Sequence, residues 1–314
     1  MTGAATVPVR AVDLGITLPA VPFTREFTPH YALSEEIAPG IRRVLARNPN
    51  AFTFHGTGTY ILGRGRVAII DPGPLLDEHV AALLAAIAGE TLTHILITHT
   101  HLDHSPAAGP LARATGAPTY GFGPHGSGKR LEGISVEEGG DMAFVPDHQV
   151  IDGEVIKGDG WAVECLHTPG HTSNHVCFAW QEAGALFPGD HVMGWSTTVI
   201  VPPDGDMAHY LASLRRLAAR PEATFYPTHG APITAPQAFV TALLAHREAR
   251  EAQIMACVSA GLDRVSTMVP VIYSETDPRL HPAAAMSVRA HLVHLIDQGS
   301  LRMDGERFLA VRPD

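Results

Sequence analysis

The chain has few cysteines and no long apolar run, and each shortage excludes a class of protein. Only Cys165, Cys177 and Cys257 occur in 314 residues, and no two of them form a Cys-x-x-Cys pair. We therefore expect neither a disulfide framework nor a cysteine-based zinc site, and the cysteine usage fits a reducing compartment. No stretch of about 18 apolar residues occurs, so the sequence predicts no transmembrane helix.

The first thirty residues also lack the apolar core of an export signal. Their apolar runs are short and broken, as in residues 14–19, Leu-Gly-Ile-Thr-Leu-Pro. We therefore expect a cytoplasmic protein.

Positive charge is scarce as well. The chain carries 22 Lys and Arg against 32 Asp and Glu, a formal net charge of −10. Proteins that bind nucleic acid without sequence preference usually present a basic face, so this balance weighs against DNA and long RNA as partners. The hydrophobic fraction of 45% is ordinary for a soluble enzyme. The length fits one large or two smaller domains.

One short stretch concentrates the polar chemistry of the chain. Residues 94–104 read His-Ile-Leu-Ile-Thr-His-Thr-His-Leu-Asp-His. The Ile-rich run at its start predicts a short buried strand. Four candidate metal ligands follow that strand: His99, His101, Asp103 and His104. Imidazole and carboxylate groups without cysteine are typical of a zinc site that keeps a position open for water.

The order of these residues also predicts the local backbone. Side chains of an extended segment alternate between two faces, so His99, His101 and Asp103 can point the same way. His104 breaks the alternation, which predicts a turn there. Ser105 and Pro106 are then typical of the N-cap and the first residue of a helix.

The run Thr-His-x-His-x-Asp-His resembles the signature of the metallo-β-lactamase superfamily. The other motifs of that superfamily follow in the same order, each at the end of a predicted strand. They contain Asp71 in Ile-Asp-Pro-Gly, His171 in Thr-Pro-Gly-His-Thr, Asp190 in Phe-Pro-Gly-Asp and His229 in Tyr-Pro-Thr-His-Gly. The resemblance covers residues 50–235 closely. It implies an α/β (α+β) fold over residues 1–233, in which two sheets pack face to face with helices outside, the αββα sandwich.

The pattern changes after residue 233. Apolar residues at helical spacing predict helices over 235–260, 266–273 and 283–298. Asp-Gly at 304–305, between two short apolar runs, predicts the turn of a closing hairpin. Residues 234–314 are therefore expected to form a mainly α, winged-helix-like C-terminal domain.

A lactamase-like domain followed by such a unit resembles the beta-lactamase-like protein 2 branch of the superfamily. Two further segments resemble that branch. One is Trp-Ser-Thr-Thr at 195–198, shortly after Asp190, and the other is His-Arg-x-x-Arg-Glu at 246–251.

The resemblance also implies roles for the ligand residues, with two Zn²⁺ per chain, or Fe or Mn in their place. One metal would be held by His99, His101 and His171, the second by Asp103, His104 and His229, and both by Asp190. Asp103 would orient the nucleophile or accept its proton. Asp71 would support a ligand by hydrogen bonding. The loop at 120–140 and the segment with Trp195, Thr197 and Thr198 would line the substrate pocket.

The expected function is that of a zinc-dependent hydrolase, in which a hydroxide shared by two metals cleaves an ester, thioester, lactone or similar bond of a small molecule. An endoribonuclease or phosphodiesterase acting on short single-stranded RNA is the alternative within this branch. A non-catalytic nucleic-acid-binding module is the alternative outside the enzymes.

The charge of the C-terminal part helps to choose among these functions. Residues 234–314 hold eight Arg and no Lys against nine Asp and Glu, a net charge of −1. A helix that reads DNA should be more basic. We therefore favour packing, a homodimer contact or pocket lining for this part, and expect neither a DNA nor a membrane partner.

Overall fold

The computed structural model describes residues 14–127 and 139–311, which form two compact units. One unit spans Val21–Leu244, and the other combines residues 14–20 with 245–311. The division falls inside one long helix, whereas the boundary expected from composition lies just before that helix. None of the helices in the described ranges combines the length and apolar character needed to cross a bilayer.

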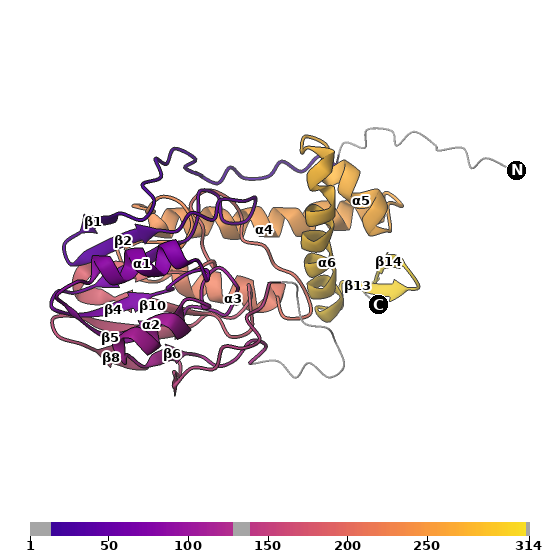
Figure 1. Cartoon of the computed structure of the whole chain (residues 1–314). Coiled ribbons are helices and arrows are strands. Elements are labelled where there is room, and N and C mark those ends of the chain that lie inside the picture. Colours follow the sequence, from indigo (N-terminus) through magenta and orange to yellow (C-terminus); the bar gives the residue numbers. More distant parts are fainter. Residues whose placement is uncertain (1–13, 128–138, 312–314) are drawn as a thin grey trace, which may run out of the picture. The chain divides into compact units, whose positions relative to one another are not determined.

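The first sheet of the larger unit has seven strands that follow one another in chain order (Figure 1). They are β1 (Ser34–Ala38), β2 (Ile41–Leu45), β3 (Gly58–Leu62), β4 (Arg66–Ile70), β5 (Thr91–Leu96), β6 (Thr119–Gly121) and β7 (His148–Gln149). The strands from β1 to β4 pair antiparallel, and those from β4 to β7 pair parallel. Parallel neighbours require crossovers; α1 (Asp77–Ala86) lies in the crossover from β4 to β5, and α2 (Ala108–Thr115) in that from β5 to β6.

The second sheet has five strands in the order β12-β11-β10-β9-β8. They are β8 (Val155–Lys157), β9 (Ala162–His167), β10 (Val176–Trp180), β11 (Ala185–Phe187) and β12 (Thr224–Phe225). A 3₁₀ turn, η1 (Gln181–Ala183), joins β10 to β11, and α3 (Met207–Ala218) connects β11 to its parallel neighbour β12. Asp206 is the N-cap residue of α3, because its side chain accepts a hydrogen bond from the His209 N–H at 3.0 Å.

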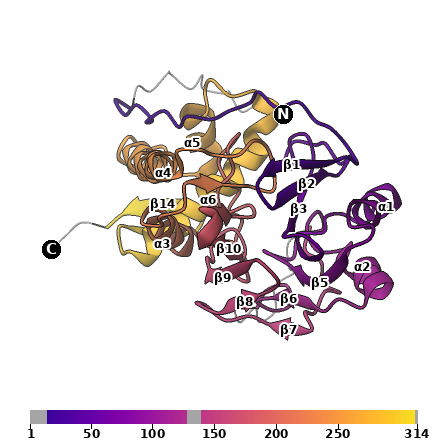
Figure 2. The same ribbon diagram turned by 90° about the vertical axis from the view of Figure 1, so that its left-hand side faces the viewer.

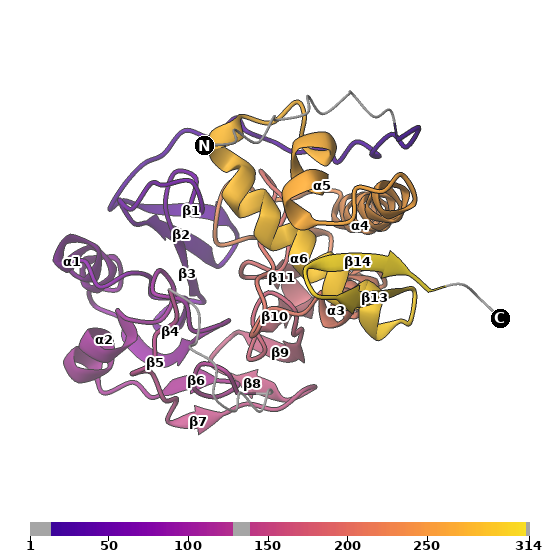
Figure 3. The same cartoon turned by 90° about the vertical axis from the view of Figure 1, so that its right-hand side faces the viewer.

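Strand β4 illustrates why the two sheets stack. Its residues Val67 to Ile70 are all buried, and alternate residues serve opposite faces of the sheet. Val67 and Ile69 pack with apolar residues of α1 and α2, whereas Ala68 and Ile70 belong to the core shared with the second sheet. Figures 2 and 3 both show α1 and α2 on the side of the first sheet that faces away from β9 and β10. The predicted αββα layers are therefore confirmed.

Two local predictions were wrong. Helix α2 begins at Ala108 with Ala107 as its N-cap residue, so Ser105 and Pro106 do not start it. The Ser105 hydroxyl instead donates to Asp141 Oδ2 at 2.8 Å. The loop expected over 120–140 overlaps β6 at its beginning, and residues 128–138 of that loop lie outside the described part of the chain.

The predicted helices and hairpin of the C-terminal part are confirmed. They are α4 (Pro236–Ser259), α5 (Val265–Ile272), the 3₁₀ turn η2 (Pro278–Leu280), α6 (His281–Asp297), β13 (Leu301–Asp304) and β14 (Arg307–Ala310). Figure 3 shows the hairpin that follows α6. The smaller unit has its own apolar core, formed by residues such as Ile254, Met268, Val288 and Leu292.

We predict that Phe187→Ala lowers the free energy of unfolding by about 3–5 kcal/mol, because it removes a buried ring from between the sheets. Phe187 is 1% exposed and lies 5.1 Å from the Tyr60 ring across the core, centroid to centroid. Phe52→Ala is the matched control: Phe52 is 57% exposed, so its loss should change stability by no more than about 0.5 kcal/mol. Urea unfolding measures both. If both variants lose the same free energy of unfolding, the Phe187 ring contributes no more to stability than an exposed ring.

Candidate metal centre

All seven candidate ligands lie on loops at the carboxyl ends of strands. His99, His101, Asp103 and His104 follow β5, His171 follows β9, Asp190 follows β11 and His229 follows β12. The structure brings all seven together in two groups, and within each group the potential ligand atoms lie within 4.8 Å of one another. The predicted set is thus assembled from four loops of the two sheets.

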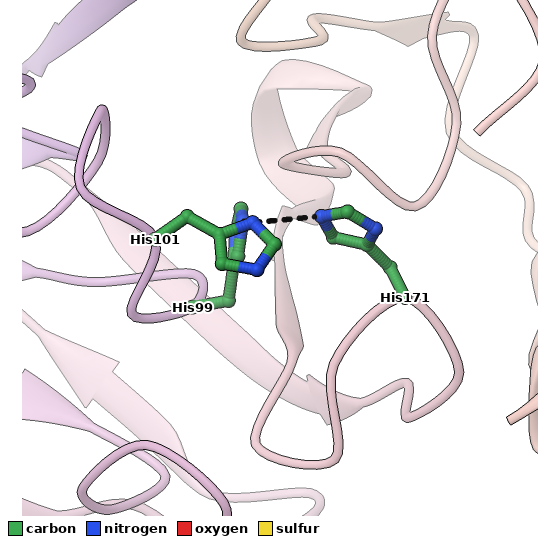
Figure 4. A group of neighbouring side chains, drawn as sticks. All are labelled: His99, His101 and His171. Carbon is green, nitrogen blue, oxygen red and sulfur yellow. Dashed lines mark hydrogen bonds between the residues drawn. The ribbon is translucent and has the colours of Figure 1, made fainter. Parts of the chain in front are cut away.

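The first group is His99, His101 and His171 (Figure 4). His101 Nδ1 lies 3.1 Å from His99 Nε2 and 3.1 Å from His171 Nε2. His171 Nδ1 donates to the Val199 carbonyl at 2.7 Å, so the Nε2 of the neutral His171 ring carries a lone pair. His99 Nδ1 lies 3.1 Å from Thr98 Oγ1. The Thr98 hydroxyl already donates its proton to Asp71 at 2.7 Å, so His99 Nδ1 is the donor to Thr98 Oγ1 and His99 Nε2 carries a lone pair.

The N–H groups of these three rings are too few to give a hydrogen bond to every ring nitrogen that faces the centre of the group. His99 Nε2 and His171 Nε2 both present lone pairs to His101, and one N–H can serve only one of them well. A cation between the three nitrogens would satisfy all of them at once, as in a zinc site.

The second group is Asp103, His104, Asp190 and His229. His229 Nε2 lies 3.1 Å from Asp103 Oδ2 and 3.3 Å from Asp190 Oδ1. His104 Nε2 lies 3.5 Å from the same two oxygens. Nevertheless His104 Nε2, His229 Nε2 and Asp190 Oδ1 are buried without a well-directed hydrogen bond. Buried polar atoms without partners are rare, so this donor set fits a metal ion.

Asp190 faces both groups. Its Oδ1 belongs to the second group, and its Oδ2 lies 3.9 Å from His171 Nε2 in the first. Thr198 holds the loop that carries it, because the Thr198 hydroxyl lies 2.8 Å from the Asp190 carbonyl and 3.0 Å from that of His191. The side chain of Thr198 is only 2% exposed. Thr198 thus supports the backbone that presents Asp190.

Asp71 ties three of the strand ends together. Its buried carboxylate accepts from the Thr98 N–H at 2.8 Å, the Thr228 hydroxyl at 3.1 Å and His104 Nδ1 at 2.9 Å. The last bond directs the other ring nitrogen of His104 into the second group. Asp71 holds this position with φ of +47°, a conformation that costs free energy for a residue other than glycine.

Gly56 supports His229 in the same way and was missed from the sequence. Its carbonyl accepts from His229 Nδ1 at 3.1 Å. A Cβ at this position would lie 2.1 Å from the Ala46 carbonyl oxygen, and φ is +133°, so only glycine fits. The glycine-rich segment His-Gly-Thr-Gly at 55–58 was the available signal.

In the second group, the pKa of each titratable side chain depends on the charges of its neighbours. Burial by itself lowers the pKa of His229, but Asp190 and Asp103 outweigh it and raise the pKa of His229 to about 10. Burial raises the pKa of Asp190, yet His229 and His104 hold that pKa well below its usual range. The two carboxylates therefore require positive charge at this point, which a divalent cation would also supply.

The expected pocket residues lie beside these loops. Trp195 stacks on Phe54, with ring centroids 4.8 Å apart and an interplanar angle of 11°. Its ring also lies close to Gly230, next to His229. Thr197 is half-buried, and its carbonyl accepts from the Ser196 hydroxyl at 3.3 Å.

Comparison with known families decides the identity of this arrangement. The family model described as the metallo-beta-lactamase superfamily matches residues 53–229. The chain belongs to this superfamily. The model of the beta-lactamase associated winged helix domain matches residues 265–308, which confirms that the C-terminal part contains a winged helix. Together with the assembled candidate ligands, the match over residues 53–229 identifies the chain as a metal-dependent hydrolase of the superfamily.

Its relatives share most of its length. It is 31% identical to an atrochrysone carboxyl ACP thioesterase of Claviceps purpurea over 77% of this chain and 74% of the relative. It is 32% identical to a beta-lactamase-like protein 2 homolog of Drosophila melanogaster over 86% of this chain and 94% of the relative. The latter similarity agrees with the predicted branch.

Solved structures share the fold of this superfamily member. A metallo-beta-lactamase family protein of Thermus thermophilus matches 88% of this chain and 100% of its own, with a TM-score of 0.71 at 22% identity. A beta-lactamase domain protein of Burkholderia ambifaria matches 93% of this chain and 97% of its own, with a TM-score of 0.72 at 19% identity.

We predict that Asp71→Asn weakens metal binding about 10- to 100-fold, because an amide is a poorer acceptor for His104 Nδ1–H. A competitive chelator titration measures the affinity. Asp147→Asn is the matched control, since Asp147 also accepts from a threonine N–H and hydroxyl, those of Thr119, but contacts no candidate ligand. Unchanged affinity in Asp71→Asn would contradict the support that we assign to Asp71.

Proposed function

We propose that this chain is a thioester hydrolase that works with two divalent metal ions, preferably zinc. His99, His101 and His171 would hold one ion, Asp103, His104 and His229 the other, and Asp190 would bind both. The observation that carries the proposal is the placement of Asp190, which presents one oxygen to each group of ligands. Imidazole and carboxylate ligands suit zinc, although iron and manganese accept them too.

The metals would supply the nucleophile: two such ions activate water near neutral pH and polarise the carbonyl under attack. A side chain of the protein must then accept the proton that the attacking water loses. Asp103 suits this task, because its side chain is 25% exposed, against 11% for Asp190 and 1% for His229. Its carboxylate can orient the attacking water, accept the proton and return it to the departing thiolate.

Two observations support a thioester as the bond that is cleaved. Relatives over about three quarters of this chain bear the name of acyl-carrier-protein thioesterases. The net charge of −10 disfavours a polyanionic substrate such as RNA. A thiolate is also a good leaving group, so the site needs no further strong acid.

The zinc-loaded full chain should be assayed on a matched series: one acyl group as thioester and oxoester, a lactone, an activated phosphodiester and a short single-stranded RNA. We expect the highest kcat/KM for the thioester. Asp103→Asn should lower kcat about 10²- to 10⁴-fold with a smaller effect on KM. Asp159→Asn, at an exposed turn, should behave as the wild type.

If the chain is instead a ribonuclease, RNA should be its best substrate. If RNA is cleaved with a higher kcat/KM than every thioester, and Asp103→Asn abolishes that cleavage, the thioester proposal is wrong. The ligand assignment would then survive.

A further inference from the structure

The three-histidine group, His99, His101 and His171, is assembled from two loops that lie far apart in the chain. His99 and His101 follow β5, and His171 follows β9, 70 residues after His101. Figure 4 shows the two loops carrying their rings toward one another. The three rings can face one ion only while the two loops keep a fixed separation. A side chain that sets this separation would therefore support ion binding without touching the ion.

Asn174 joins the two loops. It is 1% exposed, and its Nδ2 donates to Thr100 Oγ1 at 2.8 Å. The same nitrogen donates to the carbonyls of Gly123 and Pro124 at 3.1 and 3.3 Å. A carbonyl can only accept, so the nitrogen of the amide must face this side. The amide oxygen accepts from the Thr172 hydroxyl at 3.0 Å, so hydrogen bonds at both ends fix the orientation of the amide.

Both hydroxyls that bond to Asn174 belong to chain neighbours of the candidate ligands. Thr100 stands between the first two histidines of the group, and Thr172 directly follows the third. Side chains alternate along an extended segment, so the Thr100 side chain points away from the two rings beside it. Thr100 is itself 1% exposed. A hydrogen bond to its hydroxyl thus fixes the backbone that carries both rings and leaves the space between the rings free.

Ser173 fastens the His171 loop to a further segment. Its N–H and its hydroxyl donate to the Asp204 carboxylate at 3.1 and 2.5 Å, and both residues are buried. The segment before Asp204 also carries Val199, whose carbonyl accepts from His171 Nδ1. Ser173 therefore fixes the loop relative to the carbonyl that orients the His171 ring, whereas Asn174 fixes it relative to the other two histidines.

We infer that Asn174 is a positioning residue of the three-histidine group, because it holds the two loops at the separation that one ion requires. The inference rests on the proposed metal centre, but not on the thioester substrate. The second group is positioned by other contacts, such as those of Asp71 and Gly56. Removal of the Asn174 amide should therefore weaken the binding of the first ion and spare that of the second.

Competitive chelator titrations of the full chain with zinc can measure the two groups separately. The His229→Ala background removes a ligand of the second group and reports on the three-histidine group, and the His171→Ala background does the converse. We expect Asn174→Ala to weaken zinc binding about tenfold in the His229→Ala background, and by less than about twofold in the His171→Ala background.

Gln237→Ala is the matched control in both backgrounds. The Gln237 amide also donates to two backbone carbonyls, those of Arg220 and Glu222 at 2.8 and 2.9 Å, but these bonds involve no candidate ligand. Zinc affinity should stay unchanged. If Gln237→Ala loses as much affinity as Asn174→Ala, or if Asn174→Ala loses the same affinity in both backgrounds, the effect is general destabilisation and the inference is overturned.

Thr100→Val tests whether the hydrogen bond carries the effect. It keeps the shape of the side chain but removes the hydroxyl that Asn174 binds, so it should weaken the same ion. Combining it with Asn174→Ala should then cost no more than the larger of the two single losses, and additive losses would contradict the inference.

If Asn174→Ala does not fold, Thr100→Val is compared with His125→Phe, which removes the other partner of the Thr100 hydroxyl, His125 Nδ1 at 3.0 Å. A loss in Thr100→Val that is no larger than the loss in His125→Phe would contradict the role of Asn174.

These measurements do not depend on turnover. A chain that binds zinc but cleaves no thioester would refute the proposed function and leave this test intact. A His229→Ala variant that takes up no zinc would refute the three-histidine ion site, and this inference with it.

Discussion

The constraint on which this structure depends is the crowding of proton acceptors at one end of its two sheets. Imidazole nitrogens with lone pairs face one another, and two carboxylates stand 3.1–3.5 Å from buried ring nitrogens that lack a well-directed hydrogen bond. Without a cation, this arrangement would leave buried polar atoms unsatisfied, at a cost of about 1–3 kcal/mol for each. The arrangement thus fits a bound metal ion, and the strands of the two sheets position the candidate ligands.

The sandwich meets this requirement through strand ends and one carboxylate. The strands β5, β9 and β11 contribute side chains to the core between the sheets, as does Tyr226 directly after β12, so the loops that follow these strands begin at fixed points. Asp71 then joins the ends of β4, β5 and β12 through Thr98, His104 and Thr228. Backbone carbonyls of Gly56 and Val199 orient two further imidazoles. Rotation of a ligand ring would break one of these bonds, which is how the framework keeps the site organised in advance.

The sequence predicted the layers, and it named the seven candidate ligands that the structure brings together, because motifs and apolar periodicity are local properties. The seven candidate ligands occupy motifs that resemble those of the superfamily, and the helices of the C-terminal unit follow from apolar spacing alone. The start of α2 was mispredicted because Ser105 has a second use, as a donor to Asp141, 36 residues away. The role of Val199 could not be foreseen, since every residue offers a carbonyl.

Anomalous diffraction at the zinc absorption edge, from crystals of the zinc-loaded protein, tests the central claim most directly. The account predicts two peaks per chain, one among His99, His101 and His171, the other among Asp103, His104 and His229, with Asp190 between them. A single peak within the three-histidine group, with no second ion even at excess zinc, would contradict the dinuclear centre and the bridging role of Asp190.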